Sequence, residues 1–238
     1  MDISALQLAA RFSYSPNKQG YCGLGSAEEA FMRCVQEGSC ERVPEELSHF
    51  ITLFPYLKTI AAVKNCSPYD YAVIEAYWIG NEHLRDFPIE GYALLLAAFE
   101  EQGVPSWLTQ KVKQKVPTHF IPNHLFQVLH VGVGQASGSV PFTLESINHC
   151  MIRWGEVMHI DESSGAASIR TQSLVQNKHR YTLKDEDLTL QNDASPWHAL
   201  RSGDHVALHW NRVAKILTEA EISQLRLWTE HILLQIEA

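Results

Sequence analysis

The sequence is poor in basic residues and has no long apolar runs, and each shortage argues against a class of protein. Lys and Arg number 19 against 27 Asp and Glu, which gives a net charge of −8 over 238 residues. We therefore expect no nucleic-acid partner, because binding to phosphates needs a basic surface. No apolar run reaches the ~18 residues of a membrane helix, and no basic-then-apolar signal peptide opens the chain. The sequence predicts a cytoplasmic protein with no membrane partner.

Paired metal-binding spacings are also missing. The five cysteines are Cys22, Cys34, Cys40, Cys66 and Cys150, with no C-x-x-C among them. An odd count without such pairs argues against a disulfide framework and against a zinc ribbon. The 12 histidines form no H-x-x-H or H-E-x-x-H spacing, yet seven of them lie from His149 onward. The late histidines are therefore the first place to look for chemistry.

The amino-terminal half has the apolar periodicity of helices, and 45% hydrophobic residues can supply an ordinary buried core. Ser26 and Glu29 predict a capping box that opens a helix over 27–36. Pro55 should kink or split the segment 44–60. Ser67 and Pro68 predict the start of another helix, and two further helices are expected over 89–101 and 106–116.

Beyond Pro117 the pattern changes to glycine-rich turns and short strands. We predict a helical domain over 1–134, a linker over 135–147 and a second domain over 148–238. Its predicted strands cover 150–160, 166–175, 178–183, a stretch with Val206, Leu208 and Trp210, and 213–217. The acidic run Asp185–Asp187 predicts a solvated turn, Asn211-Arg212 a tight turn, and Thr218 with Glu221 a capped final helix.

This pattern predicts an α+β protein in which an all-α domain precedes a small OB-like β-barrel with a C-terminal helix. Within the barrel, Cys150 would open the first strand and His209 would lie near the end of a later one. A thiolate and an imidazole are the side chains that bind soft and borderline transition metals. The two residues are therefore the predicted metal ligands, although a cysteine alone is more often a small core residue.

Two stretches resemble the HypC/HupF-type hydrogenase assembly chaperones. The first is Cys-Met-Ile-Arg-Trp-Gly-Glu-Val over 150–157, which matches a Cys, three mostly apolar residues, Pro, Gly, any residue and Val. The second is Gly-Asp-His-Val-Ala-Leu-His over 203–209, followed by an apolar strand and an acidic helix start. The resemblance covers about 148–233, a third of the chain, whereas the helical half resembles no family that we recognise.

The resemblance implies a function in hydrogenase maturation. In that family the cysteine carries an iron precursor with cyanide and carbonyl ligands, and the strand histidine assists. The partners are a scaffold protein and the hydrogenase large subunit. By position, Cys150 and His209 take these roles here. The chain departs from the family in three ways: Cys150 is internal, Trp154 stands in place of Pro, and Asn211 stands in place of Gly.

Other residues complete the set of candidates. His149 precedes Cys150 and would lower the pKa of its thiol if protonated, or would simply be exposed. Cys22, in the glycine-rich turn 20–25, is a possible additional ligand, although a capping turn is the more common reading of that segment.

Two alternatives remain open beside the assembly chaperone. One is an enzyme with its active site in a cleft between the domains, built from Glu75, His124, His130 and Cys150. The other is a structural interaction module without chemistry of its own.

Overall fold

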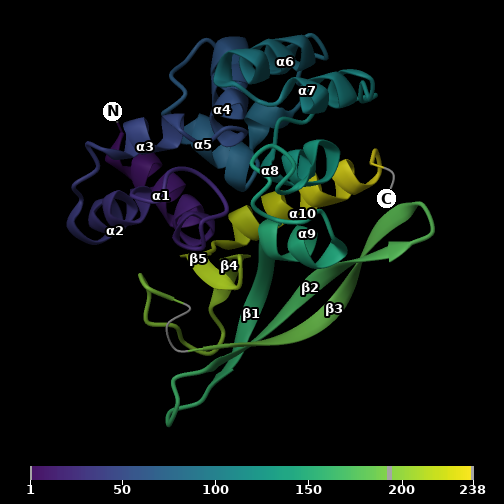
Figure 1. Cartoon of the computed structure of the whole chain (residues 1–238). Helices are drawn as coiled ribbons and strands as arrows, with labels where there is room; N and C mark the ends of the chain where they lie inside the picture. Colours follow the sequence, from purple (N-terminus) through teal and green to yellow (C-terminus); the bar gives the residue numbers. More distant parts are fainter. Residues whose placement is uncertain (1, 192–194, 237–238) are drawn as a thin grey trace. The chain divides into compact units, whose positions relative to one another are not determined.

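The computed structural model describes residues 2–191 and 195–236 and shows an α+β protein. The chain divides into two compact units, one ending at Phe142 and the other beginning at Thr143. This division falls within the predicted linker, 135–147. The two units are described separately below (Figure 1).

The first unit contains only helices among its described residues. They are α1 (Ile3–Lys18), α2 (Ala27–Glu37), α3 (Val43–Ser48), α4 (Leu53–Lys64), α5 (Tyr71–Trp78), η1 (Glu82–Leu84), α6 (Gly91–Gln102), α7 (Ser106–Lys113), α8 (His124–Phe126) and η2 (Gln127–Gly132). Large buried side chains fill its core, among them Phe12, Phe31, Tyr56, Tyr77 and Phe99.

Three sequence predictions for this unit need comment. The segment 44–60 is split as expected, but the break lies before Thr52 and Pro55 sits in the first turn of α4. The Ser26 capping box is wrong, because Ser26 has helical dihedrals and makes no side-chain cap bond. The Ser67 start is also wrong. Asp70 accepts a hydrogen bond from the Ser67 amide, so 67–70 form a turn and α5 begins at Tyr71.

The second unit contains α9 (Leu144–Cys150), five strands and α10. The strands are β1 (Arg153–Ile160), β2 (Ala167–Asn177), β3 (Arg180–Leu190), β4 (His205–His209) and β5 (Arg212–Ile216), and α10 covers Glu219–Leu233. They form one antiparallel sheet in the order β3-β2-β1-β4-β5. The Thr218 capping box is confirmed, since Thr218 and Glu221 exchange backbone-to-side-chain hydrogen bonds.

The predicted barrel is wrong, because the sheet is open. A closed barrel requires its two edge strands to pair, and within the described residues β3 and β5 do not. Strand β3, with eleven residues, and strand β5, with five, are the two edges of the sheet. The core of this unit lies on one sheet face and includes Val157, Ile169 and Leu208.

The length of β3 overturns a second expectation. The acidic run Asp185–Asp187 lies inside β3 and pairs with β2, rather than forming a turn. Asp185 and Asp187 are exposed, and the half-buried Glu186 is paired with Arg153, so none of the three charges is buried without a partner. Charged side chains on an edge strand also oppose pairing with another chain.

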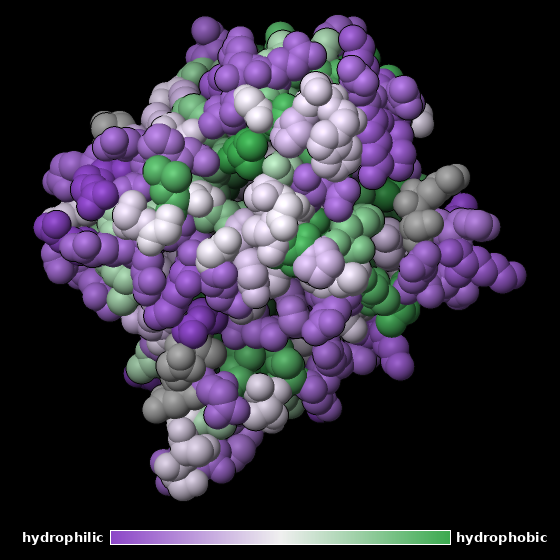
Figure 2. Space-filling view, viewed as in Figure 1, coloured by the Kyte–Doolittle hydropathy of each residue, from purple (hydrophilic) through white to green (hydrophobic). Residues whose placement is uncertain are grey.

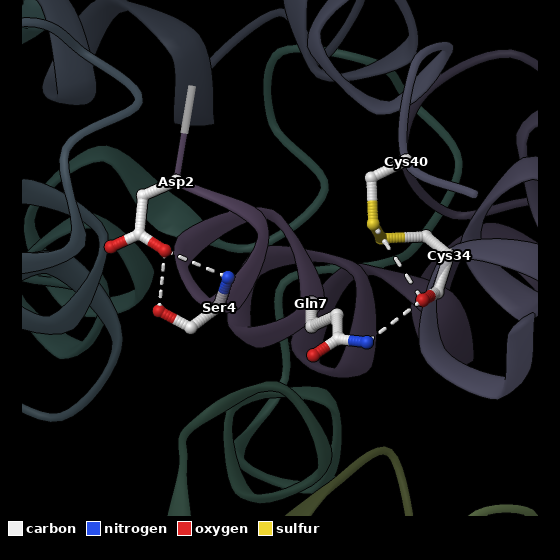
Figure 3. The surroundings of a disulfide bond; sticks show 5 residues. All are labelled: Asp2, Ser4, Gln7, Cys34 and Cys40. Atoms are coloured by element: carbon white, nitrogen blue, oxygen red, sulfur yellow. Dashed lines mark hydrogen bonds between the residues drawn. A yellow bond between two sulfur atoms is a disulfide. The ribbon is translucent and has the colours of Figure 1, made fainter. Parts of the chain in front are cut away.

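The cysteine argument against disulfides is also wrong at one place, because Cys34 and Cys40 are joined by a disulfide (Figure 3). Gly38 ends α2 in the left-handed conformation with φ 75°, and this reversal brings Cys40 back to the last turn of the helix. The Cys34 carbonyl also accepts a hydrogen bond of 3.1 Å from Gln7 Nε2. The disulfide therefore fixes the turn that follows α2, and the hydrogen bond from Gln7 holds the end of α2 beside α1.

We expect the Cys34→Ala/Cys40→Ala variant to lose about 2 kcal/mol in the free energy of unfolding of the first unit, the value for a loop this short. Urea unfolding followed by helix circular dichroism would measure the loss. Reductant should lower the stability of the parent protein by a similar amount and leave the double variant unchanged. Equal stability of the oxidised and reduced parent would contradict the prediction.

The visible surface is mostly hydrophilic, with smaller apolar areas between the polar ones (Figure 2). Among the exposed large apolar side chains, Val116 is 65% exposed and Trp107 54%. In the part of the chain that the structure describes, no helix is both long and apolar enough to cross a membrane.

Candidate metal-binding site

Cys150 and His209 lie next to each other in the second unit. Cys150 is the last residue of α9, not the first residue of a strand as the sequence suggested, and His209 ends β4. The Cys150 Sγ and a ring nitrogen of His209 are within 4.8 Å of each other. Both residues are buried, at 5% and 2% exposure. The structure thus brings together two potential ligands that are far apart in the sequence.

Backbone hydrogen bonds hold the two elements together. Strands β4 and β5 are joined by the two-residue turn Trp210-Asn211, in which both residues have positive φ, 51° and 56°. In this turn the Trp210 amide donates to the His149 carbonyl over 2.7 Å. Because His149 and Trp210 are the neighbours of Cys150 and His209, this bond fixes the separation of the two side chains.

The other side of α9 is fixed to β2. Asn148 Nδ2 donates to the Leu174 carbonyl over 2.9 Å, and the Leu174 amide donates to Asn148 Oδ1 over 2.7 Å. The end of α9 is therefore held between β2 and the β4–β5 turn. A site supported on two sides in this way changes little in geometry when a ligand binds.

Four polar residues form a hydrogen-bonded chain that ends at His149, the sequence neighbour of Cys150. Arg153 is buried; its Nη1 contacts Glu186 Oε2 over 2.7 Å, and its Nη2 donates to Asn211 Oδ1 over 3.0 Å. Asn211 Nδ2 lies 3.2 Å from His149 Nε2. Since Asn211 accepts from Arg153 through its oxygen, its amide nitrogen donates to His149, which places the His149 proton on Nδ1.

Burial and the nearby Arg153 charge lower the pKa of His149. His149 is therefore neutral at neutral pH and cannot lower the pKa of the Cys150 thiol as an imidazolium would. Asn211 stands where the HypC/HupF-type pattern has glycine. Its side chain joins Arg153 to His149, and asparagine tolerates the positive φ of this turn.

The geometry fits a tetrahedral or octahedral transition metal. Bond lengths of about 2.3 Å to sulfur and 2.0 Å to nitrogen place two neighbouring ligand atoms about 3.0 Å apart at an octahedral metal and about 3.5 Å apart at a tetrahedral one. A separation within 4.8 Å reaches these values after a small rotation of either side chain. The two side chains can hold zinc, copper(I) or iron, and further coordination positions remain for ligands that come with the metal.

The remaining candidates of the second domain have other surroundings. Trp154 is half-buried in β1 opposite Ala207, and its carbonyl accepts a hydrogen bond of 2.7 Å from Thr171 Oγ1. Its side chain lines a groove on the sheet.

Cys22 belongs to the first unit. Asn17 Nδ2 donates to the Cys22 carbonyl over 2.9 Å and to the Leu24 carbonyl over 2.6 Å, which is the capping-turn geometry. Burial raises the pKa of the Cys22 thiol to about 12. The thiolate needed for metal binding is thus disfavoured, and the expected role as an additional ligand stays a prediction.

The histidines of the enzyme alternative belong to two different hydrogen-bond networks in the first unit. The His124 Nδ1 lies 3.0 Å from Tyr77 Oη, whose hydroxyl donates to Gln127 Oε1, and Gln127 Nε2 donates to Thr52 over 2.8 Å. Tyr77 thus accepts from His124, so the His124 proton is on Nδ1. His130 Nε2 lies 2.8 Å from Tyr92 Oη.

Glu75 has a third environment. Its Oε2 accepts a hydrogen bond of 2.8 Å from Asn81 Nδ2, and its side chain is half-buried. That Glu75, His124 and His130 act in one active site stays a prediction.

His130 makes the first unit sensitive to acid. Burial, with a smaller contribution from Lys115, lowers its pKa from the usual 6.5 to about 4. The unfolded chain therefore binds a proton below pH 6.5 that the folded chain binds only near pH 4. We expect about 2 kcal/mol of stability to be lost between pH 7 and pH 5.

The matched variant is His130→Gln, which can still donate to Tyr92 but does not titrate. Urea unfolding at the two pH values should show a clearly smaller loss for this variant. The same loss in both proteins would mean that other groups cause the acid sensitivity.

Comparison with known protein families finds a model that matches residues 2–238, and it describes a family of unknown function. Comparisons with curated proteins and with solved structures find no significant match. The likeness to hydrogenase assembly chaperones therefore rests on the two sequence motifs alone.

Proposed function

The chain belongs to this family of unknown function, DUF6390, and we propose that it is a metallocentre-assembly protein that binds a transition metal through Cys150 and His209. The observation that carries the proposal is the approach of the two ligand atoms to within 4.8 Å in a buried part of the second unit.

The chemistry of the two ligands favours a metal that brings other ligands with it. A thiolate and an imidazole together suit soft and borderline transition metals. They suit an iron ion that carries cyanide and carbonyl groups, as the resemblance to HypC/HupF-type proteins implies. The thiolate would donate electron density to such an iron ion, and the rest of its coordination would come from the cargo.

A carrier of this kind needs a protein partner to receive or supply the metal. The resemblance suggests the hydrogenase large subunit or the maturation scaffold protein, acting in the cytoplasm. The open sheet would serve as scaffold, and the chain itself would carry out no turnover. This distinguishes the proposal from the enzyme alternative, which requires a substrate.

The test is co-expression with the iron-cyanide assembly proteins, followed by anaerobic purification, iron analysis and infrared spectroscopy. We expect cyanide and carbonyl stretching bands and close to one iron per chain. Both signals should disappear in Cys150→Ala and persist in Cys66→Ala, which removes a thiol of the first unit. Absence of the bands from the parent protein, with no iron retained, would refute the proposal for this cargo.

A further inference from the structure

A groove on the second unit offers a binding site separate from the Cys150–His209 pair. Its volume is about 490 Å³, within the 300–1,000 Å³ usual for small-molecule sites. Strands β1 to β4 form its floor, and α10 contributes Ile222, Arg226 and Glu230, which are four residues apart and so lie along one side of the helix. The strands and α10 can be located in Figure 1.

The floor is the sheet face opposite the hydrophobic core. Trp154 and Glu156 alternate along β1 with the core residue Val157. Glu156 lies opposite Arg170 of β2 and opposite His205 of β4. The groove therefore places polar side chains of both charges beside an indole ring.

Some of these charges already have partners. Arg170 Nε contacts Asp187 over 3.4 Å, and Gln172 Nε2 donates to Asp185 over 2.9 Å. In contrast, within residues 2–191 and 195–236 the side chains of Glu156, Arg226 and Glu230 make no hydrogen bond or ion pair. Two acids and one arginine thus remain to bind a ligand.

This combination selects one ligand chemistry. A ligand carboxylate can form a bidentate hydrogen bond to a guanidinium, and a ligand ammonium group can bind a carboxylate side chain. Arg226 and Glu230 are about 6 Å apart along the helix axis, so one small molecule can reach both charges. Trp154, Leu183 and Ile222 supply apolar contact. A polyphosphate fits poorly, because the acids of the lining outnumber its arginines.

We propose that the groove binds an apolar α-amino acid, or a dipeptide that begins with one, with the carboxylate of the ligand on Arg226 and its ammonium group on Glu156 or Glu230. The side chain of the ligand packs on Trp154. This site is separate from the proposed metal site, because its lining residues do not include Cys150 or His209.

The test is titration of the full chain with L-phenylalanine, monitored by ¹⁵N–¹H NMR. Saturable shifts should appear in β1, β2 and α10. Phenylalaninamide lacks the carboxylate and N-acetyl-L-phenylalanine lacks the ammonium group, so each should bind at least about tenfold more weakly. A Phe-Ala dipeptide carries its ammonium group on Phe and its carboxylate on Ala, so comparing its affinity with that of L-phenylalanine shows which spacing of the two charges the groove accepts.

The variants identify the contacts. Arg226→Gln should weaken L-phenylalanine at least about tenfold yet leave phenylalaninamide unchanged, because the amide has no carboxylate to lose. Arg180→Gln, in β3 but outside the groove, is the matched control and should bind like the parent. No saturable shift with any compound at 10 mM, about the highest practical concentration, would overturn the proposal. Binding that Arg226→Gln and Glu156→Gln leave unchanged would also overturn it.

Discussion

Replacing Cys150 with serine should weaken the binding of Co²⁺ to the anaerobic protein by at least about 100-fold, or roughly 2.8 kcal/mol. Cobalt(II) reports a thiolate ligand directly through its charge-transfer absorption, and it accepts the same sulfur and nitrogen donors as zinc. Serine keeps the size of the side chain but supplies a hydroxyl that remains protonated at neutral pH. The parent protein should therefore show the absorption band and the serine variant should not.

His209→Gln provides the second arm of this experiment. Glutamine fills a similar space but lacks an imidazole, so the affinity should fall while the thiolate absorption persists at saturating metal. Cys66→Ser and His205→Gln are the controls, one a thiol of the first unit and the other a histidine of the same strand as His209. If Cys66→Ser abolishes the band and Cys150→Ser does not, the metal site has been assigned to the wrong thiol.

The outer hydrogen bonds should matter less. Arg153→Met keeps much of the buried volume of Arg153 but removes its bond to Asn211, which in turn donates to His149. Arg153 bonds to neither proposed ligand, so the loss of Co²⁺ affinity should be smaller than the about 10- to 100-fold typical of groups that bond directly to a ligand. We expect the Cys150 variant to lose more affinity than the Arg153 variant, because Cys150 would coordinate the metal and Arg153 would only orient nearby residues.

The sequence predicted the Cys150–His209 pair because the motif places both residues at the ends of elements in one small domain. Their proximity depends on the Trp210–His149 hydrogen bond, which lies outside the regular strand pairing. The sequence could not show that Cys150 closes a helix. Residues 144–150 form a short helix capped by Thr143, although the sequence predicted Cys150 at the start of a strand.

Two of the errors have a common physical origin in long-range strand pairing. The run Asp185–Asp187 has the composition of a turn, but eleven registered pairs with β2 hold it in a strand. Likewise, whether β3 and β5 pair is decided between strands far apart in the sequence, which no local pattern specifies. The Cys34–Cys40 bond depends on a glycine turn at Gly38 and not on the number of cysteines. Tertiary context overrides local preference in the two strand errors, whereas the disulfide follows from a local turn.

Gly155→Ala should destabilise the second unit by about 3 kcal/mol, the upper part of the range for overpacked cores. A Cβ at this position in β1 would lie 2.6 Å from the Arg170 carbonyl oxygen, 2.8 Å from Ile169 Cγ2 and 3.0 Å from Thr171 Cβ. Two of the three contacts involve the backbone or the Cβ of β2, which cannot rotate away. The strands must separate, and the Gly155–Thr171 register pair is lost or distorted.

The consequence should reach the metal site, because β2 holds α9 through Leu174 and Asn148. A displaced β2 moves the helix that ends in Cys150, so Co²⁺ affinity should fall together with stability. Hydrogen exchange of β1 and β2 amides would measure the first effect and cobalt titration the second. Gly25→Ala is the matched control, since a Cβ there has no atom within 4 Å and its φ is not left-handed. Unchanged amide protection in Gly155→Ala would show that β2 can move aside without cost.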